Sequence, residues 1–218
     1  EELRLTAALH WFWDRRGYLA EGRARIQTAL DAAATVCEPS DTLLRVQAWT
    51  LIGGAALAFD QGDQAVVSPL AEESAALFRR LGDEGGLSMA LLRLAFAAGA
   101  ADPQQAGELL AAAQRHARAA GDPWFVGLAL FVSAQAMLFG RGDADAARAC
   151  MDEALPALRT SGDPYLLGHG LSTLGLIELA EGHWTAACTV LEQGLAQVRP
   201  LEDTRSIALL AATTADAA

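Results

Sequence analysis

The chain has 218 residues, of which 52% are hydrophobic, and carries a formal net charge of −11. So many apolar residues can bury a sizeable core. The negative balance excludes a large phosphate-binding surface, which needs clustered Lys and Arg, so we expect no direct nucleic-acid contact. No apolar run reaches about 18 residues without a polar interruption, so we expect no membrane-spanning segment.

The cysteines Cys37, Cys150 and Cys188 are odd in number and far apart in the sequence. This spacing fits neither a disulfide framework nor a set of zinc ligands. Unpaired thiols are typical of a reducing compartment, so we expect a cytoplasmic protein with these side chains buried.

A turn signal, a Gly-Asp pair or its remnant, recurs at a period of about 40 residues. The anchors are Gly17, Gly62, Ala101, Gly142 and Gly182. A second turn signal follows the last four anchors at a constant interval, in the pairs Gly82-Asp83, Gly121-Asp122, Gly162-Asp163 and Glu202-Asp203. The interval holds one helix of about 16–18 residues and a turn.

Residue size is also repeated at fixed distances from the anchors. Twelve residues after them the sequence has Ala29, Ser74, Ala113, Ala154 and Gly194, and five residues after them Gly22, Val67, Ala106, Ala147 and Ala187. Nine residues after them it has Ile26, Ala71, Leu110, Met151 and Leu191. Small residues let a second helix approach closely and large ones fill the space beside them, so we expect these columns to be buried.

The second turn signal also predicts where helices end and begin. Gly82, Gly121 and Gly162 suit the left-handed residue that ends a helix. The aspartates that follow them suit an N-cap, and Pro123 and Pro164 suit the first helical position. Each repeat is therefore predicted to be a helix A, a tight turn, a helix B and a second turn.

In chain order, the first repeat has a helix on each side of Gly17 and is followed by a looser linker at 37–41. We expect Pro69 to kink or delay its helix and Pro156 to bend its helix. The later predicted helices span 42–60, 64–81, 84–98, 123–139, 144–161, 164–180 and 184–198, with a partial helix from 203 and an irregular turn at 99–103.

These elements predict an all-α fold, a right-handed superhelical solenoid of about five helix pairs plus a truncated final helix. The expected repeats are 2–40, 41–82, 83–121, 122–162, 163–202 and a partial 203–218, and together they form one repeat domain over 1–218. The chain begins and stops inside helical patterns, without polar capping repeats, so we expect a piece of a longer protein.

Paired helices with a Gly at the inner turn and a small residue five positions later resemble tetratricopeptide repeats. Their usual period is about 34 residues, and HEAT or armadillo repeats, with periods closer to 40, are the structural alternative. The Gly-Asp turns and the alanine columns favour the tetratricopeptide interpretation.

The segment ALHWFWDRRGYLAEGRARIQTALDAA resembles the opening repeat of the large multidomain transcriptional regulators of LuxR type. These are related to the maltose-regulon activator and the Streptomyces antibiotic regulators. The segments PLAEESAALFRRLGDEGGLSMALLRLAF and GDADAARACMDEALPALRTSGDPY resemble their later repeats. The resemblance implies a repeat array in a chain that also carries a nucleotide-binding switch domain and a DNA-binding domain. The phosphate-binding motif GxxxxGK[ST] does not occur in these residues.

In such arrays the A helices line the concave binding face. The positions expected to face inward hold Trp11, Trp49, Phe59, Phe139 and His169. An apolar groove with aromatic points suits a peptide or protein partner or a small organic effector. The alternative is that these aromatic side chains pack between neighbouring helices. A general peptide-binding scaffold without a role in transcription is the competing function.

No pattern in the sequence indicates catalysis, a cofactor or a metal. No two of the four histidines lie at helical spacing for a shared metal, and no Ser or Cys lies in a nucleophile-elbow context. The carboxylate pairs Glu72-Glu73 and Asp152-Glu153 are expected on solvated helix faces. We therefore expect a binding module rather than an enzyme.

Overall fold

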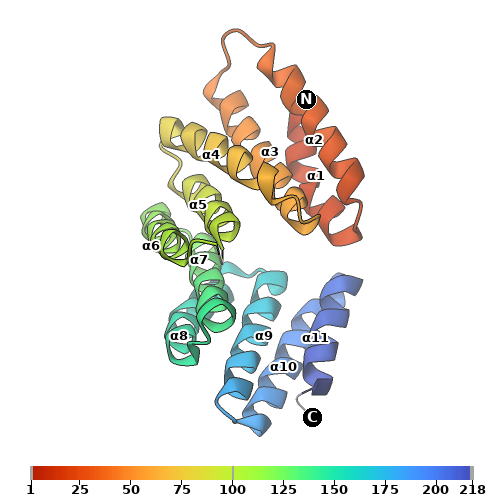
Figure 1. Ribbon diagram of the computed structural model, residues 1–218. Coiled ribbons are helices and arrows are strands. Elements are labelled where there is room, and N and C mark those ends of the chain that lie inside the picture. Colours follow the sequence, from red (N-terminus) through yellow and green to blue (C-terminus); the bar gives the residue numbers. More distant parts are fainter. Residues whose placement is uncertain (1, 100, 217–218) are drawn as a thin grey trace. The chain divides into compact units, whose positions relative to one another are not determined.

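The computed structural model describes residues 2–99 and 101–216, and these residues form eleven α-helices and no strand (Figure 1). The all-α prediction is confirmed. Contacts divide the chain into two compact units, Glu1–Ala120 and Gly121–Ala218, which we call unit 1 and unit 2. The division falls at the predicted turn between the third and fourth helix pairs. The expectation of one repeat domain over 1–218 stays a prediction.

Unit 1 consists of three successive helix pairs. Within it α1 packs against α2 and α3, α3 against α4 and α5, and α5 against α4 and α6. The A helices therefore contact one another, and a B helix contacts the A helix that follows it. The bounds are α1 Glu2–Arg16, α2 Leu19–Ala34, α3 Asp41–Asp60, α4 Gln64–Leu81, α5 Glu84–Ala98 and α6 Pro103–Ala120.

Unit 2 repeats this arrangement with two pairs and a final helix. Here α7 packs against α8 and α9, α9 against α8, α10 and α11, and α10 against α11. The bounds are α7 Pro123–Gln135, α8 Ala144–Ser161, α9 Pro164–Ala180, α10 Trp184–Val198 and α11 Thr204–Asp216. A π-helix, Ala136–Arg141, continues α7, and a 3₁₀ turn, Arg199–Leu201, follows α10.

The predicted turn chemistry is confirmed. The carboxylates of Asp83, Asp122 and Asp163 accept hydrogen bonds from the first backbone N–H groups of α5, α7 and α9. The glycines before them, Gly82, Gly121 and Gly162, all have positive φ. Glu202 takes the place of this glycine before α11 and has φ of 52°, a conformation that disfavours a residue with a Cβ atom.

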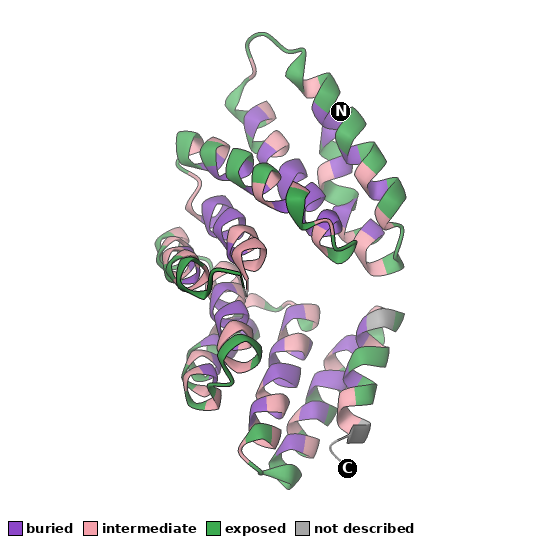
Figure 2. Ribbon diagram, viewed as in Figure 1, coloured by how far each residue is buried: buried purple, intermediate pink, exposed green. Residues whose placement is uncertain are grey.

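Burial differs between the two kinds of helix (Figure 2). The A helices α3, α5, α7 and α9 are buried on several faces, as their nearly continuous apolar sequences require. The B helices α4, α6 and α8 bury one face only. That face holds the predicted columns, all buried except for the half-buried Ala106.

Two prolines lie inside B helices without interrupting them. Helix α4 begins at Gln64, five residues before Pro69, so the expected delay of its start is wrong. Helix α8 likewise continues through Pro156 to Ser161. Each helix has buried residues on both sides of its proline, Val67 and Ala71 about Pro69 and Ala154 and Leu158 about Pro156. That packing offsets the lost backbone hydrogen bond.

His10 is a buried titratable side chain of α1. Its ring packs against Gly53 of α3, where an added Cβ would lie 2.7 Å from His10 Cβ. Burial lowers the pKa of His10, and the charges of Arg93 and Arg15 act in the same direction, against a hydrogen bond with the carbonyl of Ala7. The imidazole is therefore held neutral in the core at neutral pH.

Among the described residues, two helical segments have the length and apolar composition to cross a membrane, Asp41–Asp60 and Pro123–Arg141. The first is largely covered by other helices of the chain, with 61% of its most apolar 18-residue stretch buried.

The expectation of buried thiols is wrong for Cys37, which is exposed in the linker before α3, whereas Cys150 and Cys188 are half-buried. Residues 35–38 and 40 around this linker are also exposed.

Candidate functional site

Three of the predicted groove residues lie in unit 1, and each contacts a neighbouring side chain. Trp49 is half-buried and packs edge-on against the fully buried Phe78, with ring centroids 5.2 Å apart. Phe59 of α3 contacts Phe96 of α5, with centroids 5.4 Å apart. Trp11 contacts His10, and the Arg15 guanidinium lies 5.8 Å from its ring centroid. All three keep part of their surface accessible.

The other two predicted groove residues lie in unit 2. Phe139 is 65% exposed. His169 of α9 is half-buried, and its ring centroid lies 4.5 Å from that of Tyr165. The five residues thus divide into a set of three in unit 1 and a set of two in unit 2.

Phe139 lies in the π-helix, and the sequence explains why this helix is present. The interval from the N-cap to the anchor glycine is one residue longer from Asp122 to Gly142 than from Asp163 to Gly182. A single wide turn absorbs the extra residue without breaking the helix, and such turns are frequent at functional sites. The equivalent side chains in other pairs, Phe59 and Leu179, are half-buried, whereas Phe139 is exposed.

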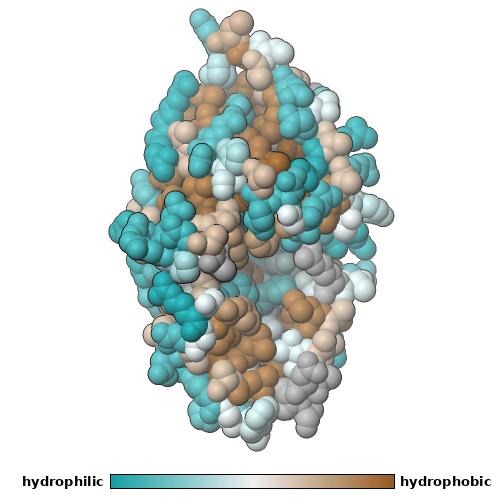
Figure 3. All heavy atoms as spheres, in the orientation of Figure 1, coloured by the Kyte–Doolittle hydropathy of each residue, from teal (hydrophilic) through white to brown (hydrophobic). Residues whose placement is uncertain are grey.

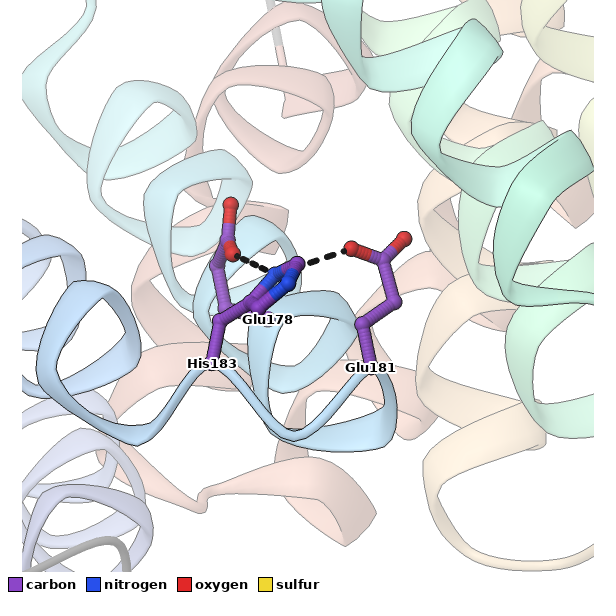
Figure 4. A group of neighbouring side chains, drawn as sticks. All are labelled: Glu178, Glu181 and His183. Atoms are coloured by element: carbon purple, nitrogen blue, oxygen red, sulfur yellow. Dashed lines mark hydrogen bonds and ion pairs between the residues drawn. The ribbon is translucent and has the colours of Figure 1, made fainter.

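Unit 2 also contains a cluster of charged residues that the sequence analysis missed, formed by Arg148 of α8, Glu178 of α9, and Glu181 and His183 of the following turn. We call it the Arg148 cluster. The Arg148 guanidinium donates to both oxygens of Glu181, at 2.6–3.1 Å, and lies 2.8 Å from Glu178. His183 Nδ1 lies 3.0 Å from Glu178 and 3.3 Å from Glu181 (Figure 4).

The ion pairs of this cluster perturb two of its members. The hydrogen bond from Arg148 lowers the pKa of Glu181, and the charges of Arg148 and His183 act in the same direction. The same hydrogen bond raises the pKa of Arg148. The carboxylate and the guanidinium therefore both stay ionised at neutral pH, and together they join α8 to the turn of the next helix pair.

The equivalent residues in unit 1 form a smaller version of the same contact. Arg23 donates to Gln61, at 2.7 Å, and to Asp63, at 2.7 Å. Arg23 and Arg148 each lie six residues after an anchor glycine. The partners of Arg23 flank the next anchor, Gly62, and Glu181 directly precedes the next anchor, Gly182. This recurrence is the sequence signal that could have found both contacts.

The Arg148 cluster has the ligand types of a metal site but also holds its own cation. One atom each from Glu178, Glu181 and His183 lies within 4.8 Å of the others. Carboxylate and imidazole groups at such distances can bind a divalent cation. The Arg148 guanidinium already donates to both carboxylates, so it takes the place that a cation would need. The geometry fits an ion-pair clasp between helix pairs.

We predict that Arg148→Met lowers the urea midpoint of unfolding at about pH 7, because two carboxylates lose their shared donor. The folded-state pKa of Glu181 is depressed, so the contribution of the clasp is present above the ordinary glutamate pKa and is lost as the pH falls through the depressed value. The difference between variant and parent should therefore shrink at about pH 3. Arg159→Met, at an exposed position of the same helix, is the control. An equal difference at both pH values would contradict this account.

Another polar group in unit 2 joins the predicted groove residue His169 to the start of α11. His169 Nε2 lies 2.9 Å from Ser206 Oγ, and Ser206 Oγ donates to Asp203 at 2.8 Å. Ser206 is buried and gives its proton directly to the carboxylate, so His169 must act as the donor to the serine. A nucleophilic triad needs the reverse order, with histidine accepting the serine proton. The arrangement is that of a helix N-cap extended by a histidine.

The surface view shows hydrophobic side chains among polar ones in each unit, including a group over α9 (Figure 3). Partly exposed aromatic rings are the feature that the two sets of predicted groove residues share. Comparison of the chain with known protein families and with curated proteins finds no match.

Proposed function

We propose that the chain is a tetratricopeptide-like repeat array whose A helices bind a peptide segment or a small organic effector. The proposal places the array in a LuxR-type multidomain transcriptional regulator, as the effector-sensing region of a longer cytoplasmic protein. Its support is the succession of helix pairs in which, within each of the two compact units, an A helix packs against the next A helix, together with the resemblance of its repeats to those regulators.

The observation that carries the binding proposal is Phe139. An aromatic ring that is 65% exposed has no packing reason to follow a helix in which residues 129–134 are all buried. A π-turn holds it outward at a cost in helix geometry, which fits a retained functional role. Aromatic side chains are also the commonest energetic centres of binding surfaces.

The test is to select ligands for the purified chain from a displayed peptide library and, separately, from small organic molecules by thermal shift. Phe139→Ala should weaken binding of the selected ligands by about tenfold or more. Trp184→Ala is the matched control, since Trp184 is 60% exposed but lies on the B helix α10. Ligands that depend on Trp184 and ignore Phe139 would refute the proposed surface.

A general peptide-binding scaffold would use the same surface without any role in transcription. The sequence that flanks this chain in its parent protein separates the two functions. The regulator proposal requires a GxxxxGK[ST] nucleotide-binding loop and a DNA-binding domain in that protein, and their absence would leave the scaffold.

A further inference from the structure

Helix α1 has two apolar faces, and only one of them is packed. Leu3, Thr6, His10 and Trp13 are buried against the rest of unit 1. A second line of residues, which we call the α1 stripe, remains exposed along the same helix. It consists of Glu2, Leu5, Leu9, Phe12 and Arg16.

The α1 stripe has the spacing of a coiled-coil seam. Its members follow one another at steps of three, four, three and four residues, so they lie on one face of the helix. Leu5, Leu9 and Phe12 are 61%, 39% and 47% exposed. Phe12 also contacts the exposed Tyr18, with ring centroids 6.0 Å apart, which widens the apolar surface.

The two ends of the stripe carry opposite charges. Glu2 lies at the N-terminal end and Arg16 at the C-terminal end, about 21 Å apart along the helix, with Leu9 midway. A two-fold axis at Leu9 would place Leu9 on Leu9, Leu5 beside Phe12, and Glu2 beside Arg16 of a second copy. A parallel pairing would place like charges together. The stripe is thus complementary to itself in the antiparallel orientation, as a two-fold symmetric interface requires.

We propose that the α1 stripe is a homodimer interface in which two copies of α1 pack antiparallel. The partner is a second copy of this chain, because the stripe supplies both charges and all the apolar contacts that it needs. One helix face is smaller than the roughly 800 Å² per partner of a standard interface, so the proposed dimer belongs to the small, reversible class of interfaces.

Sedimentation equilibrium of the whole 218-residue chain tests the proposal. Leu9→Gln should raise the dimer dissociation constant by more than about tenfold, because Leu9 contacts its own copy at the axis. Leu209→Gln is the matched control, since Leu209 is 58% exposed on α11. All these positions are exposed, so circular dichroism should show unchanged helix content.

The charge-reversal variants test the antiparallel orientation. Glu2→Arg and Arg16→Glu should each weaken the dimer about three- to tenfold, because each single change places like charges side by side. The double variant Glu2→Arg/Arg16→Glu restores both pairs and should restore the parent affinity. A chain that stays monomeric up to about 1 mM, a dimer unchanged by Leu9→Gln, or a double variant as weak as the single ones would each overturn the proposal.

Discussion

Replacing Phe78 by alanine should lower the free energy of unfolding by about 3–5 kcal/mol, measured by urea denaturation. Phe78 is fully buried on α4 and lies between Trp49 of α3 and Gly86 of α5. Its removal opens a cavity where three helices meet, and none of them can close it without leaving its other partners. Phe139→Ala, at the 65% exposed ring of unit 2, is the matched control and should cost about 0.5 kcal/mol or less.

The contact with Gly86 makes this prediction sharper. A Cβ atom added to Gly86 would overlap the Phe78 ring, so Gly86→Ala should destabilise the parent by about 1–3 kcal/mol. In the Phe78→Ala background the same methyl group enters the vacated space, and its cost should shrink or change sign. Additive effects of the two substitutions would show that the two residues are not in contact.

Replacing Ala147 or Ala154 by leucine should lower the free energy of unfolding by about 1–3 kcal/mol. Both alanines are fully buried on α8. The column of Ala154 has a small residue in every repeat, and that of Ala147 has one in every repeat except the second, which has Val67. Three additional carbons at either position must push α8 away from its neighbours. Ala149→Leu, at an exposed position of the same helix, is the control and should change stability by less than about 0.5 kcal/mol.

A near-zero loss at both Ala147 and Ala154 would mean that the repeat register is misaligned, although the turns are correct. A loss at both, with none at Ala149, would support the register in unit 2 and, through the repeat, in unit 1. Denaturation followed by tryptophan fluorescence and by circular dichroism would report any difference between the two units.

Most of the helix bounds could be predicted because the signals that set them are local. A glycine in the left-handed conformation ends one helix, and the aspartate directly after it caps the start of the next, as at Gly82-Asp83 and Gly162-Asp163. The repeat also made the buried columns predictable. A small residue that recurs at one helical position indicates that another helix packs closely against that position. The delayed start expected at Pro69 was wrong because the packing of α4 outweighs the local preference of proline.

The candidate sites were less predictable because they depend on which side chains meet across helices. The sequence pointed to the five aromatic and histidine positions, but the tertiary structure determined that Trp49 packs on Phe78 while the π-turn leaves Phe139 exposed. The Arg148 cluster joins residues 30 to 35 positions apart, and the clasp is defined by the contact of α8 with the turn after α9.

Helix α1 shows most clearly what the sequence alone determined and what it left open. Its sequence has two lines of residues at helical spacing, and the line of Leu5, Leu9 and Phe12 is the more apolar of the two. The fold nevertheless buries the line that includes His10 and Trp13. Gly53 and Gly22 lack the Cβ atoms that would collide with the side chains of His10 and Trp13, respectively. Local periodicity established the helix, and the shape of the surface it meets, built from residues distant in the sequence, decided which face is packed and which is left for a partner.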